Sequence, residues 1–324
     1  MQSLRKGFSF KHSFSSNALS RWEVICFVML AAGIKIMYGA YAFGLSDTID
    51  HLPIIYRYID SSYLVNDFRV NISELFGPRY YYSHFIAFFG KAVPMPIVFV
   101  SMTFIVNVII AASTYLMTSS IFKGSKFAPL LATAAIMTVN PFHGMAWLVL
   151  YYLKPAFLTR AIVFVSLWAA IKKRPVLSIF CACLSAFFHP TLGLEAAVFF
   201  LLFTGVHTLL DFKQHPLIGF KKIFMVFRPH LIATAIFIVY AFLFWVIPYK
   251  ISLIDTKLGT EKFLEIMLFR TERTTVPSTF SPSFFYGAIG FLLVSACSWI
   301  LWYKQESTDK NMALSLLILI VSIL

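Results

Sequence analysis

The sequence predicts an all-α fold, a polytopic transmembrane helical bundle with a long extracytoplasmic first loop carrying amphipathic interfacial helices. Three observations predict it. The 324-residue chain is 59% hydrophobic, with a mean hydropathy of +0.80 and only 13% charged residues, whereas about a quarter of a soluble domain is charged. Apolar runs of about 20 residues, long enough to cross about 30 Å of hydrocarbon, recur along it. Basic residues fall in alternate segments between these runs, as the positive-inside rule requires.

Residues 1–22 form a basic arm expected in the cytoplasm, and residues 23–324 are expected to form one transmembrane domain of about nine spans. The first apolar run is long and lacks a small-residue cleavage site, so we interpret it as a retained span rather than a signal peptide. The fourth and fifth predicted spans, residues 158–171 and 175–188, are short, which is typical of tilted, re-entrant or protein-buried segments. The last run reaches Leu324 without a polar tail, which suggests that the sequence is part of a longer chain. The predicted spans are residues 23–45, 94–117, 127–150, 158–171, 175–188, 191–210, 230–248, 284–303 and 311–324.

The net charge of +13 is spread over short segments between spans, where it sets topology and meets anionic lipid. It therefore does not indicate nucleic-acid binding. The positive-inside rule places the first loop, residues 46–93, and a second large loop, residues 249–283, on the outer side. Several cations fall on this outer side, against the topological preference. Their presence indicates an anionic ligand.

The first loop carries an apolar stripe with helical periodicity that begins near Asp50. Asp50, Arg57 and Asp60 fall on the opposite side, so we expect an amphipathic helix lying along the membrane surface. Asp50 is either the N-cap of this helix or a carboxylate held as a general base, and Asp47 could cap instead. The apolar stripe consists of Leu52, Ile55, Tyr56, Ile59 and Tyr63.

Two further outer segments carry ionisable residues. Lys154 and Arg160, between the third and fourth spans, could hold a phosphate or extend toward lipid headgroups. His189 precedes Pro190 at a break in the apolar sequence. It could exchange protons with a ligand, or cap the next helix, or pair with Glu195.

The tyrosine run 80–82 is expected at the headgroup interface. The four cysteines lie in apolar segments and are interpreted as buried hydrophobes, with no predicted disulfide framework or metal site.

These features resemble the GT-C superfamily of polytopic glycosyltransferases, in particular a distant prokaryotic branch. The resemblance covers the topology over most of the chain, and motifs in residues 46–84, 153–160 and 187–195, including Asp50-His51-Leu52-Pro53 and Gly77-Pro78-Arg79 before the tyrosine run. It implies a multi-pass protein of the plasma (inner) membrane with a cytoplasmic N-terminus, and a polyprenyl-phosphate-linked sugar as donor. The paired Asp-Glu of some relatives is absent, because His51 follows Asp50.

The resemblance also implies the chemistry. Asp50 would deprotonate an acceptor hydroxyl that attacks the anomeric carbon with inversion, and Asp47 and Asp60 are the alternative bases. A lipid phosphate leaves readily, so catalysis needs positioning, a base and cations. No metal ligand set is predicted, although a divalent ion bridging acid and phosphate is left open. The expected substrate-binding residues are His51, Arg57, Arg79, Lys154, Arg160, His189 and Glu195.

Two other functions fit the same pattern. A transporter or flippase for an anionic or lipid-linked substrate would use the outer cations without chemistry, but it would need ionisable residues at the bilayer midplane. Lys35 is the only strongly charged residue deep in a predicted span, which disfavours that pathway. A non-catalytic membrane assembly subunit would tolerate changes to the outer acids.

Overall fold

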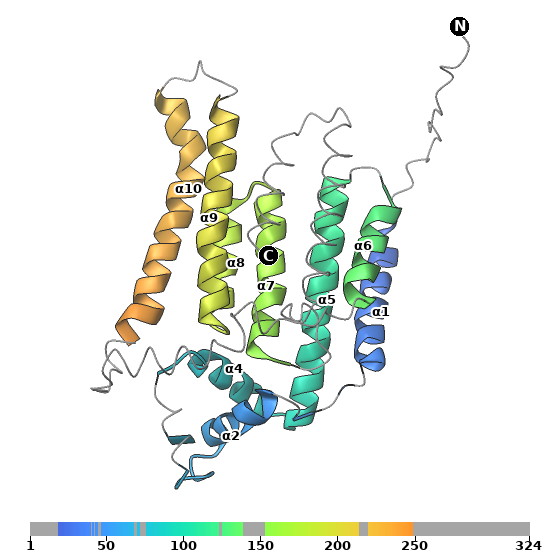
Figure 1. The fold of residues 1–324 in the computed structure, drawn as a ribbon, viewed down its shortest axis with the longest axis vertical. Helices are drawn as coiled ribbons and strands as arrows, with labels where there is room; N and C mark the ends of the chain where they lie inside the picture. The colour runs from blue at the N-terminus through green and yellow to red at the C-terminus, as the bar shows by residue number, and fades with distance from the viewer. Residues whose placement is uncertain are drawn as a thin grey trace, which may run out of the picture.

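The computed structural model describes residues 19–39, 41, 43–44, 47–67, 70–71, 76–122, 125–138, 153–213 and 220–248. Every element of regular secondary structure in these ranges is a helix, which confirms the all-α prediction. The helices, labelled as in Figure 1, are α1 (Arg21–Tyr38), α2 (Asp47–Ile59), α4 (Tyr80–Gly90), α5 (Met95–Ile121), α6 (Phe127–Thr138), α7 (Pro155–Ile171), α8 (Pro175–Ala186), α9 (Pro190–Lys213), α10 (Phe220–Ala241) and the π-helical turn η1 (Phe242–Val246).

Two of the described helices are long and apolar enough to cross a membrane by length and composition: α5 and the stretch Phe227–Val246 of α10 and η1. The other apolar stretches among the described residues are shorter, namely α6, α7, α8 and Pro190–Gly205 of α9. The 12 residues of α8 span only about 18 Å at about 1.5 Å per residue, and α7 is 17 residues long. These short helices occupy the two segments for which the sequence predicted short spans. Residues 284–303 and 311–324, the last two predicted spans, lie outside the described residues.

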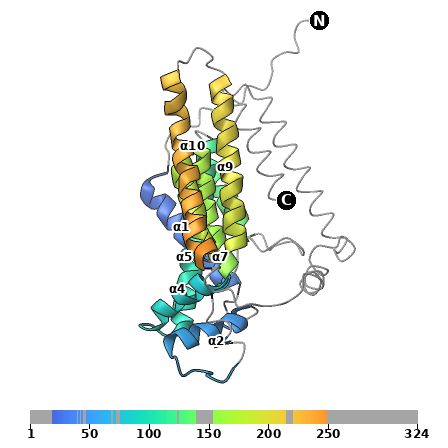
Figure 2. The ribbon, with the colours of Figure 1, turned by 90° about the vertical axis from the view of Figure 1, so that its left-hand side faces the viewer.

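The long helices α5, α7, α9 and α10 run side by side, whereas α2 and α4 lie across one end of them (Figures 1 and 2). We call this the α2–α4 end. A core of buried side chains joins α2 and α4 to α5 and α7 and includes Ile55, Tyr82, Phe99 and Phe157. A second core joins α7, α8, α9 and α10. Since α7 contributes to both cores, it fixes the α2–α4 layer relative to the helices on its other side.

Contacts at the α2–α4 end tie together segments that are distant in sequence. The Thr48 hydroxyl of α2 donates a hydrogen bond to the Leu153 carbonyl, 3.3 Å away, just before α7 begins. Phe85 of α4 packs against Phe188, with ring centroids 5.1 Å apart, where α8 turns into α9. The first loop, the start of α7 and the α8–α9 junction therefore share one end of the structure.

The amphipathic helix predicted in the first loop exists as α2, but its start, end and buried face differ from the expectation. It begins at Asp47, so Asp50 lies within it and the N-cap interpretation of Asp50 is wrong. It ends at Ile59, and Tyr63 lies in the following turn. Beside Ile55, its buried positions include the polar side chains of Thr48 and His51, because these pack against other protein segments rather than a lipid surface.

The three tyrosines at the start of α4 differ in burial. Tyr80 and Tyr81 are half-buried, but Tyr82 is fully buried in the first core, where its ring meets that of His51 at 5.8 Å. Placing all three tyrosines at a headgroup interface was therefore wrong for Tyr82. Consecutive residues on a helix point about 100° apart, so one member of the run faces the core.

Gly193 sets how closely α8 and α9 approach. A β-carbon built on Gly193 would collide with the backbone nitrogen and Cα of Ala186, which cannot move without shifting α8. We expect Gly193→Ala to lower the free energy of unfolding by about 1–3 kcal/mol, as overpacking does. Thermal unfolding in detergent micelles measures the loss. The matched control is Gly205→Ala on the same helix, where nothing lies within 4 Å of the added atom and the change should be neutral or stabilising. Equal unfolding temperatures for both variants would contradict the prediction.

Candidate functional site

Three of the predicted substrate-binding residues come together at the α2–α4 end. Arg79 precedes the first residue of α4, Arg160 lies in the second turn of α7, and His189 immediately precedes α9. The charges of Arg79 and Arg160 both act on the His189 ring. We call Arg79, Arg160 and His189 the cationic cluster. All three side chains are half-buried, so they are partly withdrawn from solvent while remaining reachable.

His189 caps helix α9. Its Nδ1 accepts a hydrogen bond from the Leu192 backbone N–H at 3.4 Å, and its carbonyl accepts one from the Gly193 N–H at 3.0 Å. Burial, together with the positive charges of Arg79 and Arg160, lowers the pKa of His189 to about 4. The ring is therefore neutral near pH 7, and because Nδ1 accepts, its proton resides on Nε2. His189 thus offers one N–H donor beside two guanidinium groups.

The depressed pKa of His189 predicts a pH dependence of stability. In the unfolded chain the imidazole protonates near pH 6.5, whereas in the folded protein it resists protonation down to about pH 4. The unfolded state therefore binds more protons between these values, and stability is complete above about pH 6.5 and falls on acidification toward pH 4. We expect the unfolding temperature of the wild type to drop across this window. His189→Asn, which keeps a capping acceptor but does not titrate, should show a smaller drop. Parallel curves for the two proteins would contradict this origin of the acid sensitivity.

The position of Asp50 is fixed through its helix. It is exposed on α2, two residues after Thr48, whose hydroxyl bonds to Leu153 immediately before Lys154. Lys154 is the N-cap residue of α7 and is half-buried. The structure therefore brings the α2 turn that carries Asp50 to the chain segment that carries Lys154. The side chain of Asp47 lies outside the described part of the chain.

A buried polar patch lies between α2 and α4, next to the cationic cluster. His51 is 7% exposed and contacts Tyr82, whose pKa is raised by burial and lowered, more weakly, by the nearby charge of Arg79. Among the described residues, neither the Tyr82 hydroxyl nor the Ser83 hydroxyl has a hydrogen-bond partner. A buried hydroxyl left unsatisfied costs about 1–3 kcal/mol. Sequence reasoning missed Tyr82, because within a run of three tyrosines only the helix phase separates the buried ring from the others.

Three further predicted site residues, Arg57, Asp60 and Glu195, are not among the groups that shift the pKa of His189. The Arg57 guanidinium donates to the backbone carbonyls of Ser61 and Tyr63, and Asp60 accepts hydrogen bonds from the backbone N–H and hydroxyl of Ser62 at 2.9 and 2.7 Å. These Ser62 hydrogen bonds lower the pKa of Asp60. Arg57 and Asp60 thus shape the turn that follows α2. Glu195 is exposed in the second turn of α9, and the groups that perturb His189 do not include it.

An aromatic cluster that sequence reasoning also missed connects α4 to the end of α10. The Tyr81 hydroxyl donates to the Phe244 carbonyl at 3.0 Å, and its ring packs against Phe187 at 4.8 Å and Trp245 at 5.5 Å. Phe244 belongs to the π-helical turn η1, and such turns are frequent at functional sites. The sequence here is uniformly apolar, so its periodicity gave no signal of a change in helix type. Tyr81 thereby holds α4 on α10 two residues from Arg79.

Metal binding has no candidate within the described ranges, where no three His, Cys, Asp or Glu side chains gather closely enough to hold an ion. Comparison with family models, with curated protein sequences and with solved structures finds no match to this chain.

Proposed function

We propose that this protein is a membrane glycosyltransferase resembling the GT-C superfamily, which transfers a sugar from a polyprenyl-phosphate donor to an acceptor at the extracytoplasmic face. The observation that carries the proposal is the cationic cluster. Arg79 and Arg160 supply fixed positive charge, and neutral His189 supplies an N–H donor. This combination suits the departing lipid phosphate, because guanidinium groups bind phosphate oxygens through paired N–H donors.

Helix geometry adds to the attraction for an anion. Helices α7 and α9 both begin at the α2–α4 end, at Pro155 and Pro190. The N-terminus of a helix carries partial positive charge, so two such ends beside two arginines favour a phosphate at this place.

The membrane location rests on apolar surface. Most of the stretch Phe227–Val246 is exposed although it is apolar and long enough to span a bilayer. An exposed apolar surface of this size is typical of contact with lipid or a partner. In the proposed orientation the α2–α4 end faces outward. The opposite end carries Lys126 and the run Lys172-Lys173-Arg174, and faces the cytoplasm according to the positive-inside rule.

The proposed reaction uses few groups. A carboxylate, Asp50 in our assignment, accepts the proton of the acceptor hydroxyl while the hydroxyl oxygen attacks the anomeric carbon. The bond from that carbon to the phosphate oxygen breaks on the opposite face, so the configuration inverts. The departing phosphate keeps the electron pair, and Arg79, Arg160 and the His189 N–H stabilise its charge. Lys154, at the start of α7, adds a further positive charge on this side.

The test is sugar transfer itself. Membranes containing the full-length protein and matched membranes lacking it are incubated with a panel of radiolabelled polyprenyl-phosphate sugars, and label leaving the lipid is followed. We expect transfer only in the presence of the protein, with inverted configuration in the product. Asp60→Asn is the internal control and should transfer as the wild type does, because the Asp60 carboxylate accepts hydrogen bonds from Ser62 in the turn that follows α2.

The alternatives correspond to other outcomes of the same assay. Specific donor binding or movement across the bilayer without transfer from any donor would replace the proposal with a transporter or flippase. Neither binding nor transfer would favour a non-catalytic assembly subunit.

A further inference from the structure

Thr159 of α7 is a buried threonine whose hydroxyl donates to a neighbouring helix. Thr103, Thr114 and Thr133 are also buried, and each donates to the carbonyl four residues earlier in its own helix, at 2.7, 2.8 and 2.8 Å. Such a bond within the helix is the usual arrangement for a helical threonine. The Thr159 hydroxyl instead donates to the Ser185 carbonyl of α8 at 3.0 Å, so it ties two helices together.

The Ser185 carbonyl connects Thr159 to the cationic cluster. It lies in the last turn of α8, where carbonyls have no partner within the helix. It also accepts hydrogen bonds from the backbone N–H groups of Phe188 at 3.1 Å and His189 at 3.3 Å. Arg160 follows Thr159 directly in the chain. One carbonyl therefore links the backbone beside Arg160 to the backbone of His189.

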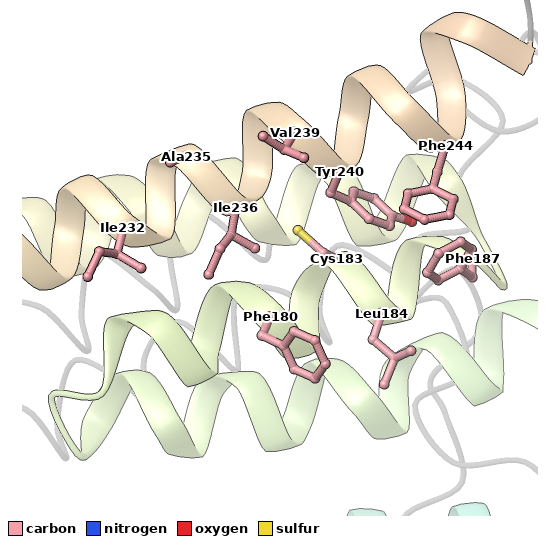
Figure 3. Close-up of a pocket in the computed structure, with 10 residues that line it drawn as sticks. All are labelled: Phe180, Cys183, Leu184, Phe187, Ile232, Ala235, Ile236, Val239, Tyr240 and Phe244. Atoms are coloured by element: carbon pink, nitrogen blue, oxygen red, sulfur yellow. The ribbon is translucent and has the colours of Figure 1, made fainter.

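Aromatic rings hold the end of α8 on its other side. Figure 3 shows the groove between α8 and α10, at one end of which Phe187 faces Tyr240 and Phe244. The ring centroids of Tyr240 and Phe244 lie 5.0 and 5.1 Å from that of Phe187. Because these contacts place the end of α8 against α10, the hydrogen bond from Thr159 places α7 relative to a segment that is already fixed.

A second hydroxyl contact joins α7 to α8 far from the cluster. The Ser166 hydroxyl donates to the Ser178 carbonyl at 2.6 Å, and both residues are fully buried. Ser166 lies in the half of α7 that is nearer the turn into α8, whereas Thr159 lies next to Arg160. The two hydroxyls therefore offer a matched pair, one near the cluster and one away from it.

We propose that Thr159 is a positioning residue, whose hydrogen bond to Ser185 holds Arg160 beside His189 so that both groups bind one phosphate. This inference rests on the proposed function and adds to it a residue that does not touch the donor. A guanidinium and an N–H donor can bind the same phosphate only when their spacing matches its oxygens, and a misplacement of about 1 Å can cost about 100-fold in rate.

The first test measures the pKa of His189 by nuclear magnetic resonance of the histidine-labelled full-length protein. The charge of Arg160 helps to hold this pKa at about 4. Thr159→Val removes the hydroxyl with little change in volume, and we expect the pKa to rise as Arg160 moves away from the ring. Thr159→Ser keeps the hydroxyl, and Ser166→Ala removes the bond far from the cluster, so both should keep the pKa at about 4. An unchanged pKa in Thr159→Val would overturn the proposal.

Burial also lowers the pKa of His189, so its effect must be separated from that of Arg160. The separation uses Thr159→Val in an Arg160→Ala background. If Thr159 acts through Arg160, the added substitution should raise the pKa no further. A further rise as large as that in the wild-type background would show that the substitution changes burial, and would overturn the proposal.

Sugar transfer provides the functional readout. We expect Thr159→Val to lower kcat/KM for the lipid donor about tenfold, with Thr159→Ser and Ser166→Ala close to the wild type. Unchanged transfer by a Thr159→Val protein whose His189 pKa has risen would overturn the role of Thr159 in the reaction. If the wild type transfers no sugar, the proposed function fails, and binding of radiolabelled farnesyl phosphate decides this inference. That binding should weaken about tenfold in Thr159→Val, and equal binding would overturn the proposal.

A measurement on the unmodified protein covers the case in which Thr159→Val does not fold. In the threonine-labelled wild type, the Thr159 hydroxyl proton should exchange slowly with water, because the hydroxyl is buried and hydrogen-bonded to Ser185. Its signal is assigned with Thr159→Ser. Rapid exchange of this proton would overturn the proposal.

Discussion

Replacing Asp50 with Asn is expected to reduce the rate of sugar transfer by about 10²- to 10⁴-fold, the usual contribution of a general base. The amide keeps the size and hydrogen-bonding shape of the side chain but cannot accept the acceptor's proton. Asp50 is exposed, and its helix is fixed to the start of α7 through the hydrogen bond from Thr48 to Leu153. The measurement is the transfer rate at saturating donor and acceptor, with donor binding measured separately and expected to be unchanged.

The position of Asp50 in α2 distinguishes loss of a general base from loss of a helix cap. Asp50 lies inside α2, three residues after its first residue, so Asp50→Asn removes no helix cap. Loss of transfer without loss of stability would therefore report on chemistry. Asp47→Asn is the companion variant. If Asp47→Asn abolishes transfer while Asp50→Asn retains it, the base is Asp47, and the assignment of Asp50 is wrong.

The helices were largely predictable from the sequence because apolar runs and their breaks are local signals. Predicted spans 94–117, 158–171, 175–188 and 191–210 correspond to α5, α7, α8 and α9 within a few residues at most boundaries. The break at His189-Pro190 was also visible, since proline at a first helical position starts a helix and cannot continue one. The end of α2 was not, because the apolar stripe continued to Tyr63 although Asp60 and Ser62 form a turn there.

The spatial arrangement of the candidate site was less predictable. Sequence reasoning selected Arg79, Arg160 and His189 individually, as polar residues on one side of the membrane, but their proximity depends on how α4, α7 and α9 pack. It left His189 as a proton-exchanging group, a helix cap or a partner of Glu195, and only local partners could be named from the sequence. The neighbouring charges come from segments 110 and 29 residues away, counting from 189 back to 79 and 160. The burial of Tyr82 and the hydrogen bond from Tyr81 to Phe244 depend on tertiary contacts that leave no periodic signal in the sequence.

Replacing Arg160 with Ala is expected to lower kcat/KM for the lipid donor about 100-fold. A charge-assisted hydrogen bond contributes about 1.5–3 kcal/mol, and about 1.4 kcal/mol corresponds to a factor of ten in rate. Arg160→Lys should lose less, about tenfold, because it keeps the charge but not the planar fork of donors. Arg160 is half-buried in α7. Its charge is therefore less screened by solvent than the charge of an arginine on the open surface.

His189 provides a readout of Arg160 that does not depend on activity. Burial is the main cause of the low pKa of His189, and the charges of Arg79 and Arg160 lower it further. Arg160→Ala should therefore raise this pKa part of the way from about 4 toward 6.5, while Arg160→Lys should leave it low. Nuclear magnetic resonance of histidine-labelled protein, assigned with His189→Asn, measures the pKa directly.

The two readouts together separate a phosphate-binding role from a structural one. An Arg160→Ala protein that loses donor use and raises the His189 pKa, yet unfolds at the wild-type temperature, has lost a charge from the cationic cluster and nothing else. If donor use falls while the His189 pKa stays at about 4, the guanidinium does not act on His189, and the cluster cannot hold a phosphate in the way proposed. If both values are unchanged, Arg160 belongs to the helix surface, and Arg79 and Lys154 become the groups to test against the departing phosphate.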